Sequence, residues 1–136
     1  MYLIDTNVLS ELRRRDRTDR AVASWADNVD PLDLFLSAIT ILEIEAGALM
    51  IQRRDKAQGA VLRAWIDSKV LPAFAGRILA VDTTVAQRCA RLHAPNPRTE
   101  RDALIAATAL VYRLTMVTRN IADFQAMGVD LLNPWE

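Results

Sequence analysis

The sequence predicts an α/β protein whose centre is a parallel sheet of four to five strands. Short apolar runs without polar alternation, such as Tyr-Leu-Ile at residues 2–4, are typical of strands buried on both faces. Amphipathic stretches with helical spacing separate these runs. Residues 40–54 and 55–74 predict two consecutive helices without an intervening strand, which indicates an α-hairpin on one side of the sheet. The 136 residues are expected to form a single domain, residues 1–136.

Five apolar runs are predicted to be strands because each is short, rich in aliphatic residues and bounded by polar or turn-forming residues. The expected strands are residues 2–4, 34–36, 78–81, 115–118 and 129–132. The segments predicted to be helices carry apolar residues at three- and four-residue spacing. The expected helices span about residues 6–14, 19–28, 40–54, 55–74, 85–93 and 100–114.

Residues at the predicted helix ends support these boundaries. Thr40 and Glu43 match a capping box, in which a threonine and a glutamate three residues later satisfy each other's backbone donors. Thr83 or Thr84 is expected to cap the helix after the third strand. Pro72 marks the end of the fourth helix, since proline cannot continue a helical ladder.

The composition is that of an ordinary globular protein with balanced charge. There are 17 basic and 17 acidic side chains, whereas proteins that hold nucleic acid mainly by electrostatics are usually more basic. Cys89 is the only cysteine, which excludes an internal disulfide or a cysteine metal cage and fits a reducing cytosol. No stretch approaches the roughly 18 apolar residues of a membrane span, and no secretory signal is visible. We therefore expect a cytoplasmic protein without membrane association.

Four carboxylates are expected near one edge of the sheet. Asp5 fits a helix N-cap, Glu43 fits the capping box, and Asp102 suits the positive end of a helix dipole. Asp123 follows a strand end, as Asp5 does. These separate explanations do not account for a common location, because right-handed crossovers bring all four positions to the edge where open α/β sheets bind ligands. Asp82 also follows a strand, but capping alone explains it.

Four such carboxylates would repel one another, so a cation must balance them or some must stay protonated. Hard divalent ions with oxygen ligands, Mg²⁺ or Mn²⁺, are the natural occupants. Zinc is disfavoured because the chain offers one cysteine and one histidine, His93, which is expected near a helix end. Such a site supports phosphodiester hydrolysis.

Four segments carry a family resemblance. They are Leu-Ile-Asp-Thr-Asn-Val-Leu at residues 3–9, Thr-Ile-Leu-Glu at 40–43, Asp-Ala-Leu-Ile-Ala-Ala-Thr-Ala at 102–109 and Thr-Arg-Asn-Ile-Ala-Asp-Phe at 118–124. In this order and spacing they resemble the PIN-domain family, and within it the VapC toxins of type II toxin–antitoxin systems, especially the FitB-like group. The resemblance covers essentially the whole chain, including Asn-Pro-Trp at residues 133–135.

The resemblance implies a PIN-like parallel sheet sandwiched by helices. It also implies a Mg²⁺- or Mn²⁺-dependent endoribonuclease toxin that cuts structured RNA such as tRNA or ribosomal RNA and inhibits translation. The family's acidic quartet, its catalytic residues and metal ligands, falls on Asp5, Glu43, Asp102 and Asp123. The supporting polar positions fall on Thr6, Asn7, Thr118 and Asn120.

The partners implied by the resemblance are an RNA substrate and a cognate VapB-type antitoxin. The antitoxin's C-terminal segment would lie over the active-site groove, and operator DNA would be bound only through the antitoxin. A homodimer is expected, which would pair further in a toxin–antitoxin assembly.

Two other functions compete with this interpretation. A phosphohydrolase with an aspartate nucleophile would use Asp5, but such enzymes carry a second aspartate two residues on, where this chain has Asn7. A catalytically silent binding module of the same fold would not need the acidic quartet, which is intact here.

Overall fold

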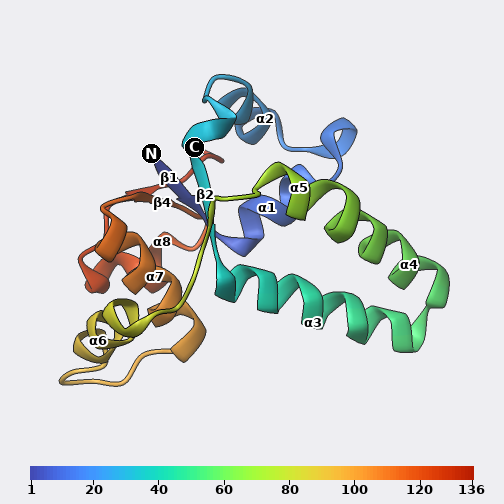
Figure 1. Cartoon of the computed structure of the whole chain (residues 1–136). Coiled ribbons are helices and arrows are strands. Elements are labelled where there is room, and N and C mark those ends of the chain that lie inside the picture. Colours follow the sequence, from blue (N-terminus) through green and yellow to red (C-terminus); the bar gives the residue numbers. More distant parts are fainter.

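Five parallel strands form one sheet in the order β3-β2-β1-β4-β5, and the computed structural model describes all residues 1–136 (Figure 1). The strands are β1 Tyr2–Ile4, β2 Leu34–Ser37, β3 Ile78–Leu79, β4 Thr115–Val117 and β5 Leu131–Leu132. The helices are α1 Thr6–Leu12, α2 Arg20–Asp27, α3 Ala38–Arg54, α4 Lys56–Trp65, α5 Leu71–Ala73, α6 Thr83–Leu92, α7 Glu100–Tyr112 and α8 Ile121–Phe124. Short 3₁₀ turns cover Arg15–Arg17, Pro31–Asp33 and Gln125–Met127. The predicted α/β class is confirmed.

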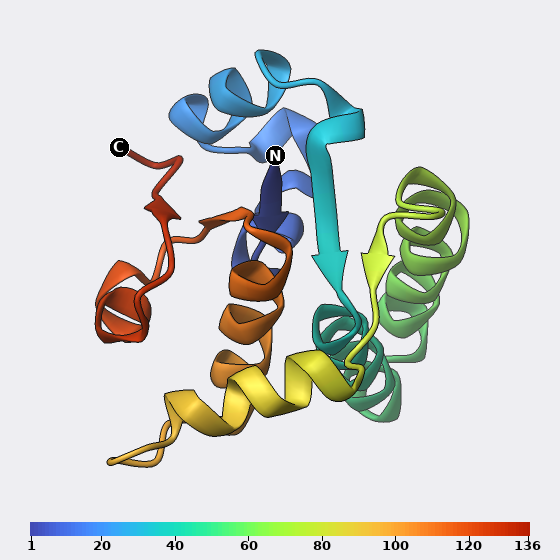
Figure 2. The same cartoon turned by 60° about the vertical axis from the view of Figure 1, so that its left-hand side comes forward.

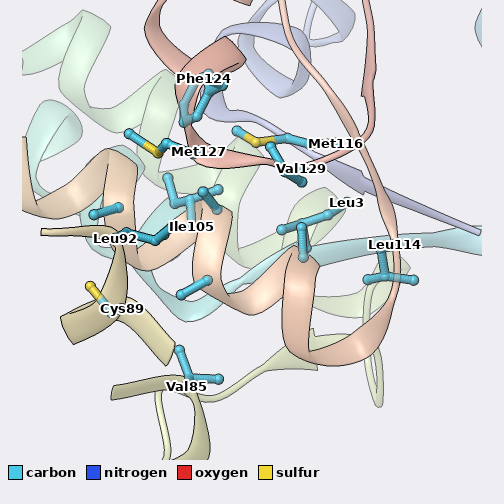
Figure 3. Close-up of a cluster of buried hydrophobic side chains, with 14 residues drawn as sticks. Leu3, Val85, Cys89, Leu92, Ile105, Leu114, Met116, Phe124, Met127 and Val129 are labelled. Atoms are coloured by element: carbon cyan, nitrogen blue, oxygen red, sulfur yellow. The ribbon is translucent and has the colours of Figure 1, made fainter. Parts of the chain in front are cut away.

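Helices cover both faces of the sheet because consecutive strand residues point to opposite sides. Leu3 and Met116 lie in a buried cluster with residues of α6, α7 and α8, which Figure 3 shows in close-up. Ile4 and Val117 lie in a second cluster with residues of α1 and α3. The two helical layers stand on opposite sides of the strands in Figure 2. This arrangement explains the all-apolar strands and buries the centre of the sheet completely.

The predicted α-hairpin is formed by α3 and α4, which reach out beyond the sheet in Figure 1. The two helices approach closely at Gly59, where an added Cβ would lie 2.5 Å from the Cα of Gln52. Such a contact is shorter than any side chain tolerates, so only glycine fits there. No helix of the protein combines the length and the hydropathy that a membrane span requires.

The start of α3 differs from the expected one. The helix begins at Ala38, and Ser37 caps it by accepting a hydrogen bond from the backbone N–H of Ile39 at 3.0 Å. The capping box predicted for Thr40 and Glu43 is therefore wrong. Both residues lie within the helix, which frees the Glu43 carboxylate for other contacts.

The helix predicted for residues 55–74 is interrupted. After α4 the chain forms a π-helical turn, Ile66–Val70, before α5. Pro72 lacks a backbone N–H, and its ring would clash with the carbonyl four residues earlier in a regular helix. Sharp kinks in helices usually lie at a proline or at a π-helical bulge, and here the two occur together. The third and fifth strands are also shorter than expected, with two residues each.

Candidate metal centre

The candidate site lies where the strand order reverses. The chain passes from β1 to β2 and β3 on one side and then crosses to place β4 on the other side of β1. In open parallel sheets, the strand ends at such a switch point frame a crevice that binds ligands. Asp5 directly follows β1, and Thr118 directly follows β4. The sequence thus brings a carboxylate and a hydroxyl from distant segments to one point.

Asp5 is a buried carboxylate with both oxygens in hydrogen bonds. It is 5% exposed, and its Oδ1 accepts from the backbone N–H of Thr6 at 2.8 Å. Its Oδ2 accepts from the hydroxyl of Thr118 at 2.8 Å and from the amide of Asn7 at 3.2 Å. Burial raises the pKa of Asp5 above its usual value, even though these hydrogen bonds lower it. The N-cap role is therefore real, but it occupies one oxygen only.

Glu43 reaches the same edge from α3. The hydroxyl of Thr6 donates to Glu43 Oε1 at 2.7 Å and also lies 3.2 Å from Thr40 Oγ1. Arg101 Nη1 lies 3.9 Å from Glu43 Oε2, at the start of α7. Thr6 thus links the Asp5 region to Glu43, because its backbone N–H serves Asp5 and its side chain serves Glu43.

The negative charges of the other three acids act on the carboxylate of Asp102. Burial is the largest cause that raises the pKa of Asp102, and the charges of Asp5, Asp123 and Glu43 raise this pKa further. Asp102 lies in the first turn of α7, and Asp123 lies in α8. The two side chains line one hollow of about 390 Å³. The four predicted acids are therefore electrostatic neighbours.

The quartet is not a closed metal cage, because no three acidic, histidine or cysteine side chains are arranged to hold an ion directly. Mg²⁺ usually keeps several waters and takes only one or two carboxylates from the protein. The donor set fits such an ion, since carboxylate oxygens are its preferred ligands. A cation would also offset the charge repulsion that raises the pKa of Asp102.

All four predicted supporting residues lie in this hydrogen-bond network, three of them through their side chains. Thr6 and Thr118 bond the carboxylates as described, and Asn7 Nδ2 also lies 3.3 Å from Thr118 Oγ1. Asn120 takes part through its backbone N–H, which donates to Thr118 Oγ1 at 3.0 Å. Thr118 therefore orients Asp5 while it also fixes the start of the following turn.

Two residues that compete with the quartet have structural roles. Asp82 is exposed and caps α6, because its Oδ1 accepts from the backbone N–H of Val85 at 2.9 Å. The expected cap at Thr83 or Thr84 is wrong by one or two residues. His93 ends α6, and its Nδ1 accepts from the backbone N–H of Arg98 at 3.0 Å.

Sequence reasoning missed Arg119 and Trp135. The guanidinium carbon of Arg119 lies 5.0 Å from the centre of the Trp135 ring, a cation–π contact beside the site. Both residues sit in segments that carry the family resemblance, but neither is an acid or a metal ligand. Their contact depends on β5 returning beside β4, which local sequence patterns do not reveal.

Comparison with known proteins identifies the family. A model of the PIN domain matches residues 2–129. The chain belongs to the PIN-domain family. Among curated relatives, "VapC ribonuclease Y4jK" of Sinorhizobium fredii is 36% identical over 100% of this chain and 99% of its own length. "Toxin FitB" of Neisseria gonorrhoeae is 39% identical over 99% of each chain. The predicted resemblance to VapC and FitB proteins is confirmed.

Solved structures confirm the PIN fold. The crystal structure of FitAcB from Neisseria gonorrhoeae superposes with a TM-score of 0.90 at 35% identity, covering 100% of this chain and 99% of that one. The structure of FitAB bound to an IR36 DNA fragment gives a TM-score of 0.88 at 35% identity, covering 100% of this chain and 96% of that chain. The five-stranded sheet and its helical layers are thus those of a PIN domain.

Proposed function

We propose that this PIN-domain protein is an endoribonuclease toxin that requires Mg²⁺ or Mn²⁺, cuts structured RNA such as tRNA or ribosomal RNA and thereby inhibits translation. The observation that carries the proposal is the hydrogen-bond network that joins buried Asp5 to Glu43 through Thr6, with Asp102 and Asp123 lining one hollow at the same edge of the sheet. A site with this much negative charge favours a hard cation. The names of the relatives, a VapC ribonuclease and a toxin, support the same chemistry.

The acidic quartet would hold a divalent ion, which would supply Lewis acidity at the scissile phosphate and lower the pKa of an attacking water. The chain's own residues hold this arrangement in place. Thr118 and the Thr6 backbone fix the two oxygens of Asp5, and the Thr6 hydroxyl fixes Glu43. Since outer hydrogen bonds of this kind orient metal ligands, the network preorganises the site.

The aspartate-nucleophile alternative finds less support. The hydrogen bonds that the Asp5 oxygens accept do not decide between a nucleophile and a metal ligand, because a carboxylate has about four lone-pair sites, so the second acidic position decides. Asn7, which stands where such enzymes carry a second acid, donates one of these bonds. A silent binding module would have no reason to keep four acids whose charges oppose one another.

The proposal includes a partner. Structures similar to this one are described as FitAB or VapBC complexes, and three of them are bound to DNA, at TM-scores of 0.88, 0.68 and 0.74. By analogy, we expect a VapB-type antitoxin that covers the site, a toxin homodimer within the complex, and operator DNA bound through the antitoxin. An RNA-cleaving toxin of this kind would act in the cytoplasm. A short reading frame directly upstream of the gene would encode the antitoxin.

The test is to map the 5′ ends of total RNA after brief induction. The wild-type protein should produce new ends at few positions in tRNA or ribosomal RNA and stop growth. Asp5→Asn should produce none, while the matched control Asp82→Asn should cut as the wild type does. New ends of equal abundance in the Asp5→Asn sample would overturn the assignment of this site.

A further inference from the structure

A hollow of about 400 Å³ beside the acidic quartet is lined by arginines. Arg13, Arg14, Arg17 and Arg119 line it, and the only acid in its wall is Glu11. None of the four guanidinium groups forms a salt bridge, since the ion pairs of the protein use Arg15, Arg63 and Arg101. In a chain with zero formal net charge, this is a local concentration of unpaired positive charge.

Distant segments of the chain build this basic hollow. Arginines at the end of α1 suit the helix dipole, which accounts for Arg13 and Arg14 but not for Arg119. Arg119 arrives from the end of β4 and lies over the ring of Trp135, one residue before the C-terminus. Trp135 is itself held by a hydrogen bond from its backbone N–H to Asn133 Oδ1 at 2.9 Å. The hollow is thus a tertiary feature.

The basic hollow adjoins the acidic quartet on two sides. Asn7 lines the hollow, donates to Asp5 Oδ2 at 3.2 Å and accepts from the backbone N–H of Arg119 at 3.3 Å. Arg13 also lines a groove of about 200 Å³ that contains Glu43. Arg119 also lines a hollow that contains Asp123.

We propose that the basic hollow binds the phosphodiester backbone of the RNA strand next to the scissile phosphate. This inference rests on the proposed function, because a strand cut at the quartet must continue over the neighbouring surface. Arginine forks match phosphate oxygens in geometry and charge. The position of Asn7, between Asp5 and the arginines, assigns the hollow to the nucleotide adjoining the cut. An acidic protein segment is the competing occupant.

The experiment measures binding separately from cleavage. Every protein carries Asp5→Asn, and the probe is a short fluorescent single-stranded RNA of mixed sequence, followed by anisotropy at several salt concentrations. The hollow variant is Arg14→Gln/Arg17→Gln/Arg119→Gln. The matched control is Arg53→Gln/Arg54→Gln/Arg91→Gln, at exposed arginines without ion pairs. A lysine version of the hollow variant tests whether charge suffices.

Each lost contact to a single-strand phosphate lowers the slope of log K against log salt by about 0.7, so three contacts lower it by about 2. We expect this loss in the hollow variant, an unchanged slope in the control, and a slope near that of the control in the lysine version. Equal slopes in the hollow variant and the control would overturn the proposal. Unchanged RNA binding together with lost binding of polyglutamate would overturn it in favour of an acidic protein partner.

Failure of the proposed function would look different. If the wild-type protein cuts no RNA while the hollow variant still shows the lower slope, the hollow binds RNA and the hydrolytic assignment falls. If the wild type cuts RNA and the slopes are equal, the hydrolytic assignment stands and the basic hollow has no part in holding the strand.

Discussion

Asp5 and Asp82 start from the same local pattern and have different environments. Each lies past the end of a strand and accepts a backbone hydrogen bond at the start of the next helix, Asp5 at 2.8 Å and Asp82 at 2.9 Å. Asp5 is buried at the centre of the sheet and receives a further bond from Thr118. Asp82 is exposed and follows β3, an edge strand. The position of the strand, and not the cap itself, distinguishes the two aspartates.

The comparison shows how a fold converts a common capping residue into a candidate ligand. Only at the switch point does a second strand end, that of β4, bring a hydroxyl to the free oxygen of the cap. The same point brings Glu43 within reach of Thr6. Beside β3 the neighbouring strand end is that of β2, where Ser37 caps α3, and Asp82 accepts only the backbone bond of its own helix start. Asp82 therefore remains a cap.

The largest expected difference concerns RNA cleavage. Asp5→Asn should lower the rate by more than the ~100-fold that loss of an outer hydrogen-bond partner costs, because it would remove a charged ligand of the proposed ion. Asp82→Asn should leave the rate unchanged, since asparagine caps helices as well as aspartate does. Single-turnover cleavage of RNA in Mg²⁺ or Mn²⁺ measures both. Equal cleavage rates for Asp5→Asn and Asp82→Asn would show that the two aspartates do not differ in function.

A smaller loss is expected at Thr118. Thr118→Val keeps the size of this fully buried side chain but deletes its hydrogen bond to Asp5 Oδ2 and the bond that it accepts from the backbone N–H of Asn120. We expect a 10- to 100-fold lower rate or metal affinity, as for other partners that orient a ligand. Thr84→Val, beside Asp82 on the exposed start of α6, is the control and should have no effect. A normal cleavage rate for Thr118→Val would show that Asp5 does not need the hydrogen bond from Thr118, at the end of β4, for its role.

Asp102 should show the stability cost of the quartet. Its pKa is raised by burial and by the other acids, and it accepts no side-chain hydrogen bond, so its charge destabilises the metal-free fold. Asp102→Asn should therefore raise the Tm in a chelator. Mg²⁺ should raise the Tm of the wild type more than that of the variant, because only a bound ion stabilises the folded state. A lower Tm for Asp102→Asn in the chelator would contradict this account.

The smallest effect is expected at the edge strand. Asp82→Ala removes the cap of α6 and should lower the free energy of unfolding by about 1 kcal/mol. For a chain of this size the Tm should fall by about 3–4 °C. Cleavage at a temperature well below the Tm should remain normal. A loss of cleavage in a folded Asp82→Ala protein would mean that Asp82 is more than a cap.

Much of the fold could be predicted because its strands are fully apolar and its helices amphipathic. Leu3 and Ile4 are both apolar because helices cover both faces of the sheet, and that pattern is visible in the sequence. Helix starts were harder to predict. Thr40 and Glu43 match a capping box, but Ser37, at the end of β2, is the N-cap, so α3 begins three residues earlier than this pattern predicts.

That the four candidate acids lie near one another could be predicted from the sequence, whereas their hydrogen-bond contacts could not. Asp5 and Asp102 carry a signal because carboxylates near strand ends or helix starts are recognisable in the sequence. The link from Thr6 to Glu43 requires the start of α3 to be known within one residue, since a shift would turn Glu43 away. The contact of Arg119 with Trp135 requires the pairing of β4 with β5.

The most direct test of the central claim is Mn²⁺ binding by electron paramagnetic resonance, with Asp5→Asn and Asp82→Asn titrated beside the wild type. The switch-point account predicts that the wild type and Asp82→Asn bind Mn²⁺ with equal affinity and that Asp5→Asn binds it far more weakly. Binding by Asp5→Asn as tight as that of the wild type would contradict the account, whatever the cleavage assays show.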